Sequence, residues 1–493
     1  MANLIKKKKI IIIGGITLAI VVLVVIIIII ASSSSKKGND SSEEEEKRLP
    51  SLGEISCIFE VQSTTNPTSI LSSYFEKETN FGIEIDGKLI RYEKEHKFEK
   101  SGHIPVKFLI YESIKMDFMF KNLSNLISVE MSSQQNCEIK SMKGAFESCS
   151  NLEDMSIKGF DTSKVTSMSR LFYNTAFEEI DISDLNTENV QDMSEMFALS
   201  RIITLDMSKM DTKNVKNMSG MFQFSSSLYE LDLSVNTENV EDMSKMFYFC
   251  GGLEYLKLNI NTKNVKNMQG MFQECITLGE LDVSSFNTEE VTDMSFMFEN
   301  CCSLEELKLT NFNTAKVTTM SHMFSYCSSL ETLDVSSFDT SNVVDASNMF
   351  ELCRYIENLD LSKFKMPKLQ DMAFMFYYMA SLKSIDISSF EPTSLKNMTH
   401  LFDSCASLQS IKFGSLKTKD VHEMSYIFAD CTSITSLDIS YFETDSAENM
   451  SCMFSGCVLL RELDVSKFRT SSVKDMSGMF EFCSLLTSLS VTK

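Results

Sequence analysis

Apolar side chains return along this chain with a period of 25 or 26 residues. The marker of the period is a Met-Phe pair or a close variant of it. Its Phe stands at residues 120, 146, 172, 197, 222, 247, 272, 298, 324, 350, 376, 402, 428, 454 and 480. A unit of this length cannot bury its apolar face alone, so the period predicts stacked units that share one core.

Two spacings alternate within one unit. The first is i, i+3, i+4, i+7, which predicts one face of a short helix or 3₁₀ turn, and its residues are Met294, Met297, Phe298 and Cys301. The second is the alternation of Leu307 and Leu309 with Lys308, which predicts a strand. We therefore expect an α/β repeat over residues 114–493: a leucine-rich-repeat-like solenoid of about fifteen strand-plus-short-helix units.

The segment 51–113 lies outside the repeat and has a different pattern. Strand-like runs cover Ile55–Val61, Phe81–Tyr92 and Ile104–Tyr111, and Asp86-Gly87 has the composition of a hairpin turn. This pattern predicts a small β-rich cap that covers the first repeat.

The amino-terminal residues predict an anchor. Ile10–Ile30 is an uncharged apolar run that would reach about 31 Å as a helix, enough to cross a bilayer. Four lysines at 6–9 precede it, so we expect 1–9 to be cytoplasmic, 10–30 to be a transmembrane signal anchor and 31–50 to be a disordered tether. The expected localisation is a single-pass plasma-membrane protein with extracellular repeats; a cleaved signal peptide is the alternative.

At this point the chain resembles a known family. The stretch 281–298, Leu-Asp-Val-Ser-Ser-Phe-Asn-Thr followed by Val-Thr-Asp-Met-Ser-Phe-Met-Phe, and its counterpart 463–480 are similar to the bacterial-surface-protein 26-residue repeat. That family is a relative of the BspA-like leucine-rich repeats. The resemblance implies a curved solenoid on a cell surface, with members regarded as adhesins or host-interaction proteins, and it implies no catalytic residues.

The charge narrows the choice of partner. The formal net charge is -22, and the acidic excess lies after Pro50. Such a surface repels phosphate backbones, so nucleic acid is not an expected partner.

Sulfur-containing side chains follow the repeat. Met stands four residues before the repeat Phe in every unit except one, which has Ala346 there. These methionines could bind Cu(I) or fill the core, and their phase with Phe favours the core. Ten cysteines stand three residues after the Phe: Cys149, Cys250, Cys275, Cys301, Cys327, Cys353, Cys405, Cys431, Cys457 and Cys483. Buried free thiols are predicted there, because the unbroken run of five units from 250 to 353 cannot pair completely. Cys57 and Cys137 remain the candidates for a disulfide.

Catalytic motifs are missing from the sequence. His322 and His400 share a repeat position, but three units separate them by roughly 14 Å, too far to bind one metal. No phosphate loop, HExxH or GxSxG motif occurs. We therefore predict a protein that is not an enzyme and needs no cofactor.

The candidate ligand face is the row of outward side chains on the predicted strands, called the strand row below. Its members are Asp181, Asp206, Asp232, Lys257, Asp282, Lys308, Asp334, Asp360, Asp386, Lys412, Asp438 and Asp464. The row is either a solvated face or a recognition surface. As a recognition surface, it would suit a basic partner or divalent cations best along Asp334, Asp360 and Asp386.

These observations together predict a membrane-anchored cell-surface protein that binds a protein or glycan ligand on another cell or matrix. A structural surface-coat protein and a secreted binding module are the alternatives. The last strand, Leu489-Ser490-Val491, has no cap after it, so we expect either fraying of the last unit or end-to-end self-association through it. Sequons begin at Asn39, Asn122, Asn217, Asn397 and Asn449.

Overall fold

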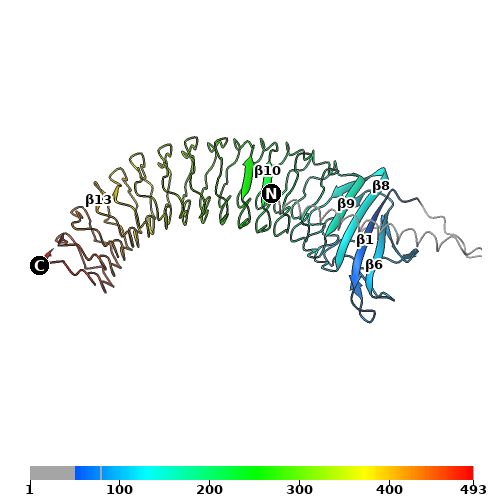
Figure 1. Cartoon of the computed structure of the whole chain (residues 1–493), viewed down its shortest axis with the longest axis horizontal. Coiled ribbons are helices and arrows are strands. Elements are labelled where there is room, and N and C mark those ends of the chain that lie inside the picture. The colour runs from blue at the N-terminus through cyan, green and yellow to red at the C-terminus, as the bar shows by residue number, and fades with distance from the viewer. Residues whose placement is uncertain (1–49, 78–79, 492–493) are drawn as a thin grey trace, which may run out of the picture. The chain divides into compact units, whose positions relative to one another are not determined.

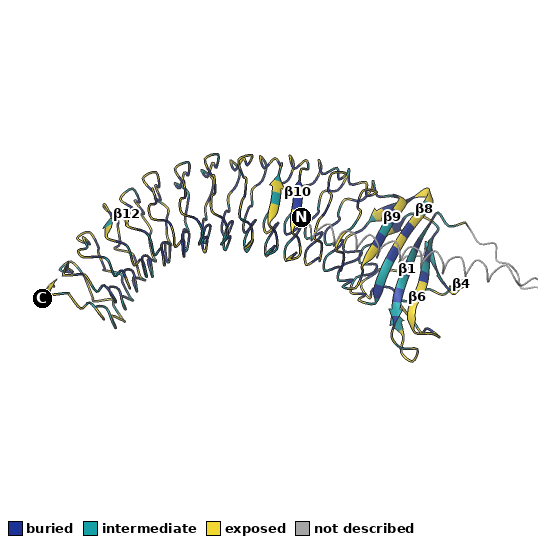
Figure 2. Ribbon diagram, in the orientation of Figure 1, coloured by how far each residue is buried: buried dark blue, intermediate teal, exposed yellow. Residues whose placement is uncertain are grey.

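The chain divides into two units, Met1–Pro50 and Ser51–Lys493. The computed structural model describes residues 50–77 and 80–491. Over these residues the second unit begins with a β-sheet and continues as a β-solenoid of about 14 turns, whose coils follow one another along an arc (Figure 1). Buried residues line the inside of the coils as far as Val465, and the last coil has only half-buried and exposed residues (Figure 2).

The first part of this unit is a seven-stranded sheet with the order β4-β3-β6-β1-β8-β7, to which β9 is added beside β8. Its strands are β1 (Gly53–Val61), β3 (Phe81–Ile85), β4 (Lys88–Ile90), β6 (Gly102–Ile110), β7 (Ile114–Lys115), β8 (Leu126–Ser141) and β9 (Asp154–Asp161). Two short strands, β2 (Thr68–Ser69) and β5 (Glu95–His96), pair beside it.

The predicted cap strands are confirmed. Strand β1 alternates buried and half-buried residues, as expected for a sheet with one face on the core. The hairpin at Asp86-Gly87 is confirmed too, because Ile85 pairs with Lys88 and both loop residues have positive φ, 50° and 73°. The sheet does not end at residue 113, however: β8 and β9 pair in parallel and lead into the first coils.

The predicted strand-plus-short-helix unit is wrong, because the described residues contain no helix. Where a short helix was expected, each coil makes successive tight turns. Two residues per coil have positive φ, such as Phe296 at 60° and Asn300 at 53°, and an α-helix cannot continue through that conformation.

Hydrogen bonding explains how a series of turns can place side chains at the spacing of a helix. The N–H groups of Met297, Glu299 and Cys301 donate to carbonyls three residues earlier, at 3.1 to 3.3 Å. The N–H groups between them point to the next coil: Phe296 donates to Ser321 at 2.9 Å and Phe298 to Met323 at 3.0 Å. The same side chains face the core as in a helix, but half of the backbone donors join one coil to the next.

The strand side of the coil is less regular than predicted. Described strands occur in three parallel pairs: β10 (Glu230–Leu233) with β11 (Tyr255–Leu258), β12 (Ser384–Asp386) with β13 (Ser410–Lys412), and β14 (Glu462–Asp464) with β15 (Ser488–Ser490).

Ring spacing differs between the two sides of the coil. The Phe286 and Phe312 rings, next to the strand side, are 6.4 Å apart, whereas Phe272 and Phe298 on the turn side are 5.7 Å apart.

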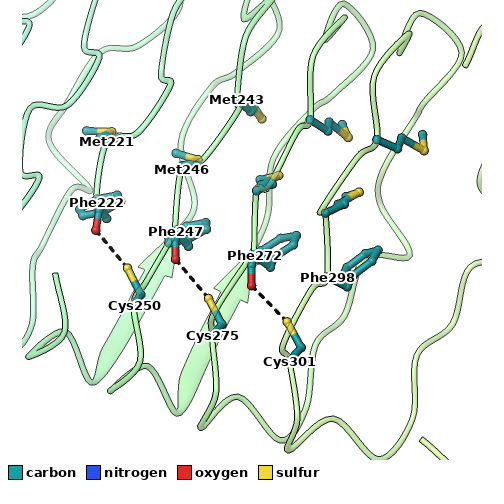
Figure 3. Close-up of a cluster of buried hydrophobic side chains, with 14 of the residues drawn as sticks. Met221, Phe222, Met243, Met246, Phe247, Cys250, Phe272, Cys275, Phe298 and Cys301 are labelled. Carbon is teal, nitrogen blue, oxygen red and sulfur yellow. Dashed lines mark hydrogen bonds between the residues drawn. The ribbon is translucent and has the colours of Figure 1, made fainter. Parts of the chain in front are cut away.

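The predicted core is confirmed. The Met and Phe side chains of the repeat are fully buried in the middle of the solenoid, where Phe222, Phe247, Phe272 and Phe298 form a continuous ring stack (Figure 3). The Met stripe therefore packs as core, a role that suits an unbranched, polarizable side chain.

The predicted transmembrane helix needs a correction. Within the described residues no helix occurs that could serve as a membrane span. The run Ile10–Ile30, its lysine cluster and the tether 31–50 lie outside the described residues, apart from Pro50. The predicted single-pass plasma-membrane topology, with extracellular repeats, is therefore not supported.

Candidate functional site

The strand row lies where the sequence predicted it, on the outer surface of successive coils. All twelve side chains are exposed except that of Asp386, which is half-buried. Where strands pair, the register places row members side by side: Asp232 opposite Lys257 and Asp386 opposite Lys412. The row is thus a regular line of charges that a ligand can reach.

A turn motif explains why Asp recurs in this row. The Asp181 carboxylate accepts a hydrogen bond from the Ser183 N–H at 2.9 Å, and Asp334 and Asp464 make the same bond to the serine two residues later. Hydrogen bonding by the serine side chain, and then by its N–H, stabilises the charged carboxylate and lowers the pKa of each Asp. One carboxylate oxygen of each Asp therefore has a structural role in the turn that follows it.

Two lysines of the row relieve part of the repulsion between its carboxylates. Lys257 lies 2.6 Å from Asp232 and Lys412 lies 3.2 Å from Asp386. Lys308 instead pairs with Glu306 at 3.3 Å, outside the row.

Two open hollows lie along the strand row. One, of about 570 Å³, is lined by Asp181, Asp206 and Lys209 among others. The other, of about 330 Å³, is lined by Asp438, Asp464 and Ser490 among others. The stretch around Asp360, which the sequence favoured for cations, lines neither hollow. No cluster of three metal-binding side chains is found in the part of the chain that the structure describes.

A second surface, which sequence reasoning missed, runs along the turns. In each coil the residues two before and two after the repeat Phe have positive φ. Over the five coils from Phe296 to Ser404 these residues are half-buried or exposed, except Leu352, which is buried, and the residue directly after the Phe is buried or half-buried. We call this surface the turn strip over five coils. Its residues are Phe296, Glu299, Asn300, His322, Ser325, Tyr326, Asn348, Glu351, Leu352, Phe374, Tyr377, Tyr378, His400, Asp403 and Ser404.

The turn strip combines stacked rings with carboxylates. The His400 ring stacks between Phe374 and Tyr426 at centroid distances of 4.5 and 4.4 Å, and His322 stacks on Phe296 at 4.6 Å. A signal in the sequence could have revealed this strip. The position two residues before the repeat Phe holds glycine in some units, such as Gly220, Gly270 and Gly478, and bulky residues in others. Glycine in such a column indicates positive φ.

Carboxylates of the strip affect its tyrosines. Burial, and then the nearby Glu351 and Glu299, raise the pKa of Tyr326. Burial, followed by Asp403 and Glu351, raises the pKa of Tyr377. The phenols therefore stay neutral beside the carboxylates.

The cysteines three residues after the repeat Phe have a structural role. The Cys250, Cys275 and Cys301 thiols each donate to the carbonyl of a Phe in the preceding coil at 3.0 to 3.2 Å (Figure 3). Burial raises the pKa of Cys250 to about 12, so this thiol stays protonated and can donate. The prediction of free thiols is confirmed, and the candidate pair Cys57 and Cys137 is also unbridged.

Most of the sequons coincide with a structural position. The side-chain oxygens of Asn217, Asn397 and Asn449 accept hydrogen bonds from the N–H two residues later, at 2.9, 3.1 and 3.0 Å. Asp293 holds the same repeat position and makes the same bond. These sequons therefore follow from the repeat pattern; Asn122 lies in a turn with positive φ, and Asn39 is outside the described residues.

The fold and these two faces define a class, a repeat protein whose coils form a β-solenoid with regular rows of outward side chains. A family model described as "Mycoplasma protein of unknown function, DUF285" matches residues 114–235, 233–307, 301–412 and 378–490. These matches cover most of the chain, which therefore belongs to the DUF285 family.

Other comparisons add little. No curated protein matches the chain. Among solved structures, "Crystal structure of TLR13-ssRNA13 complex" is similar at 15% identity over 76% of each chain. Its TM-score of 0.16 is too low to support an argument about the fold or the ligand.

Proposed function

We propose that this chain is a non-catalytic binding protein that recognises a protein or glycan partner through the strand row of its solenoid. The observation that carries the proposal is the row itself: exposed charged side chains recur coil after coil, in register and beside open hollows. Solenoids commonly use such continuous surfaces for extended contacts. The resemblance to the bacterial-surface-protein 26-residue repeat, and through it to BspA-like leucine-rich repeats regarded as adhesins, supports a role in adhesion or host interaction.

The first hollow offers the sharpest test of the row. Asp181→Asn with Asp206→Asn removes two charges at this hollow but keeps an oxygen that can accept the serine N–H. Glu238→Gln with Glu289→Gln is a matched control, since it removes two charges from exposed positions off the row.

The purified full-length chain and both variants are screened on protein and glycan arrays, and saturable binding is then measured for the hits. We expect the Asp variant alone to weaken binding. Equal binding by all three chains would mean that the row is only a solvated face.

Self-association has separate support. In the fifteenth coil Phe480 and Leu486 are only half-buried, although the equivalent core residues are buried in earlier coils. Phe482 beside them is 71% exposed, against 43% for Tyr326 at the same repeat position. We propose that two molecules pair through this apolar surface, because covering it would remove apolar area from water.

A further inference from the structure

Two histidines of the turn strip, His322 and His400, occupy the same repeat position and are both held in ring stacks between coils. The His400 ring lies between Phe374 of the preceding coil, at 4.5 Å, and Tyr426 of the following coil, at 4.4 Å. These three rings are nearly parallel, with interplanar angles of 10° and 7°. The His322 ring stacks in the same way on Phe296 of the preceding coil, at 4.6 Å. Each histidine therefore contacts a neighbouring coil through the face of its ring.

Carboxylates lie at the edges of both histidine rings. The Nδ1 atom of His400 lies 2.6 Å from Asp403. The Nδ1 atom of His322 lies between the carboxylates of two coils, 3.4 Å from Glu299 of the preceding coil and 3.9 Å from Glu351 of the following coil. The two histidine and three acidic side chains are only 10 to 27% exposed, so water and salt screen their charges weakly.

The carboxylates are fixed in place by neutral groups. Hydrogen bonds reach all three from uncharged side chains: Gln273 donates to Glu299, Ser325 and Asn348 donate to Glu351, and Ser404 donates to Asp403. A neutral donor orients a carboxylate but does not cancel its charge. The Nδ1 atom of His322, in contrast, is buried and has no hydrogen-bond partner among the residues that the structure describes.

A proton on either ring strengthens these contacts. An imidazolium forms a charge-assisted contact with a nearby carboxylate, and a cation is attracted to the face of an aromatic ring. The rings stacked on His400 and the carboxylates beside His322 belong to neighbouring coils, so a positive charge on either histidine joins coil to coil. Histidine is also the side chain that ordinarily changes its charge between pH 5 and 8.

Other ionisable groups surround the two histidines. They are Glu274, Tyr326 and Arg354 in the coils around His322, and Tyr377, Tyr378, Tyr426, Asp430 and Cys452 in the coils around His400. Burial raises the pKa of Tyr326 and Tyr377, so these phenols stay neutral where histidine titrates. Arg354 carries the opposing charge, and its guanidinium lies 5.0 Å from the centroid of the Tyr378 ring. Burial also opposes a positive charge, but each histidine side chain is about one quarter exposed and has a carboxylate beside it.

We infer that protonation of His322 and His400 strengthens the stacking of the coils from Phe296 to Tyr426, so that this part of the solenoid opens less often at mildly acidic pH than at neutral pH. The sign follows from linkage: the closed coils hold the protons more tightly than the open coils, so the added stability is present at low pH and is lost as pH rises through the titration of histidine. The inference does not depend on binding at the strand row.

Amide hydrogen exchange of the purified full-length chain, followed by mass spectrometry at pH 7.5 and 5.5 and corrected for the intrinsic pH dependence of exchange, tests this inference. We expect the coils within residues 296–326 and 376–430 to open about tenfold less often at pH 5.5. The coils within residues 190–290 contain no histidine and should change less than about twofold. Residues 340–375 are omitted from the comparison, because the neighbouring carboxylates of Asp345 and Asp371 also respond to pH.

Matched variants separate the charge from the stacking. His400→Phe keeps an aromatic ring between Phe374 and Tyr426 but cannot take up a proton, and His400→Gln removes the ring as well. Both variants should lose the pH response of residues 376–430, and His322→Gln should lose that of residues 296–326. His422→Gln is the control, because this histidine is exposed and lies outside the ring stacks, and its response should match that of the unchanged chain.

Four results would overturn the inference: a pH response that survives in His322→Gln combined with His400→Phe, an equal response in the coils without histidine, a response lost in His422→Gln, or coils that open more often at pH 5.5. The last result would mean that the cost of burying a charged imidazole exceeds the gain from its carboxylates and rings. Each of these results leaves the proposed role of the strand row to its own binding test.

Discussion

Carboxylate and amide side chains alternate along the line of bridges that joins the turn sides of the coils. Asp293 lies between Asn267 and Thr319 in this column, whereas Asp345 and Asp371 are direct neighbours. Burial, and to a smaller extent the charge of Asp345, raise the pKa of Asp371. Replacing Asp345 by Asn should therefore stabilise these coils at neutral pH, because it removes the repulsion between adjacent carboxylates.

The size of the effect can be worked from this geometry. Like charges directly opposite each other in a sheet cost about 0.2–1 kcal/mol, which corresponds to roughly 1.4- to 5-fold slower opening of the coils. The substitution keeps the local bonds, since an Asn oxygen can accept from the Ser347 N–H as the Asp345 oxygen does at 3.0 Å. Asp293→Asn is the matched control, with the same bond to Ser295 at 2.9 Å and the same change in net charge.

The sign of the pH dependence follows from the raised pKa of Asp371. A group whose pKa is higher in the folded state contributes stability at low pH and loses it as pH rises through that pKa. Below it Asp371 is neutral and does not repel Asp345, so Asp345→Asn should gain little there and most at pH 7.

Amide hydrogen exchange followed by mass spectrometry reports opening coil by coil, which suits a repeat protein. We expect slower exchange around residues 340–375 in Asp345→Asn only. Equal protection in Asp293→Asn, or a gain that persists at low pH, would refute the reasoning.

Three further predictions concern the core and the last coil. In urea denaturation, Phe298→Ala should lower the free energy of unfolding by about 3–5 kcal/mol, whereas His322→Ala, on the half-exposed turn strip, should lower it by about 1 kcal/mol or less. Similar losses in the two variants would mean that the ring stack is not the core. Cys301→Ala should lower the thermal midpoint, at a cost of about 0.5–1.5 kcal/mol, because the Phe272 carbonyl loses its thiol donor and keeps only the Cys275 N–H. Cys301→Ser should be milder, since Ser225 donates to Phe197 in the same way at 2.8 Å, and a larger loss in the Ser variant would contradict this role. Light scattering on the unchanged chain across a concentration series should show a mass that rises toward that of a dimer, and Phe482→Ser should suppress this rise. A mass that stays at the monomer value would exclude pairing through the last coil.

The sequence was sufficient to predict the phase of the repeat, because Phe, Met and Cys each return at one position and bury the same face. It was not sufficient to predict the backbone between them. Spacings such as that of Met294, Met297 and Phe298 suit a helix, but turns with positive φ at Phe296 give the same inward face and free alternate N–H groups for the next coil. Intrinsic preferences argue against a phenylalanine in that conformation, so coil-to-coil hydrogen bonds override them here.

The same limit applies to the candidate sites. Alternation around Lys257 and Lys308 placed the strand row on the surface correctly, since outward positions of a strand are defined by a period of two. The turn strip has no such period, because its outward residues are set by backbone conformation. The ion pairs of Glu147 with Lys121 and Arg170, and the approach of His322 to Glu351, could be seen only once neighbouring coils were in contact.

Asp and Asn alternate along the line of backbone bridges between the turn sides of the coils, and this alternation affects how the molecule ages chemically. Asn is a thermolabile residue that hydrolyses to Asp, and the product would accept the same backbone hydrogen bond. At Asn217 this change would place three carboxylates in adjacent coils, with Asp192 and Asp242 on either side. Each deamidation that yields Asp would thus keep this hydrogen bond while adding repulsion between coils, so the molecule would be weakened electrostatically before any contact in its core had changed.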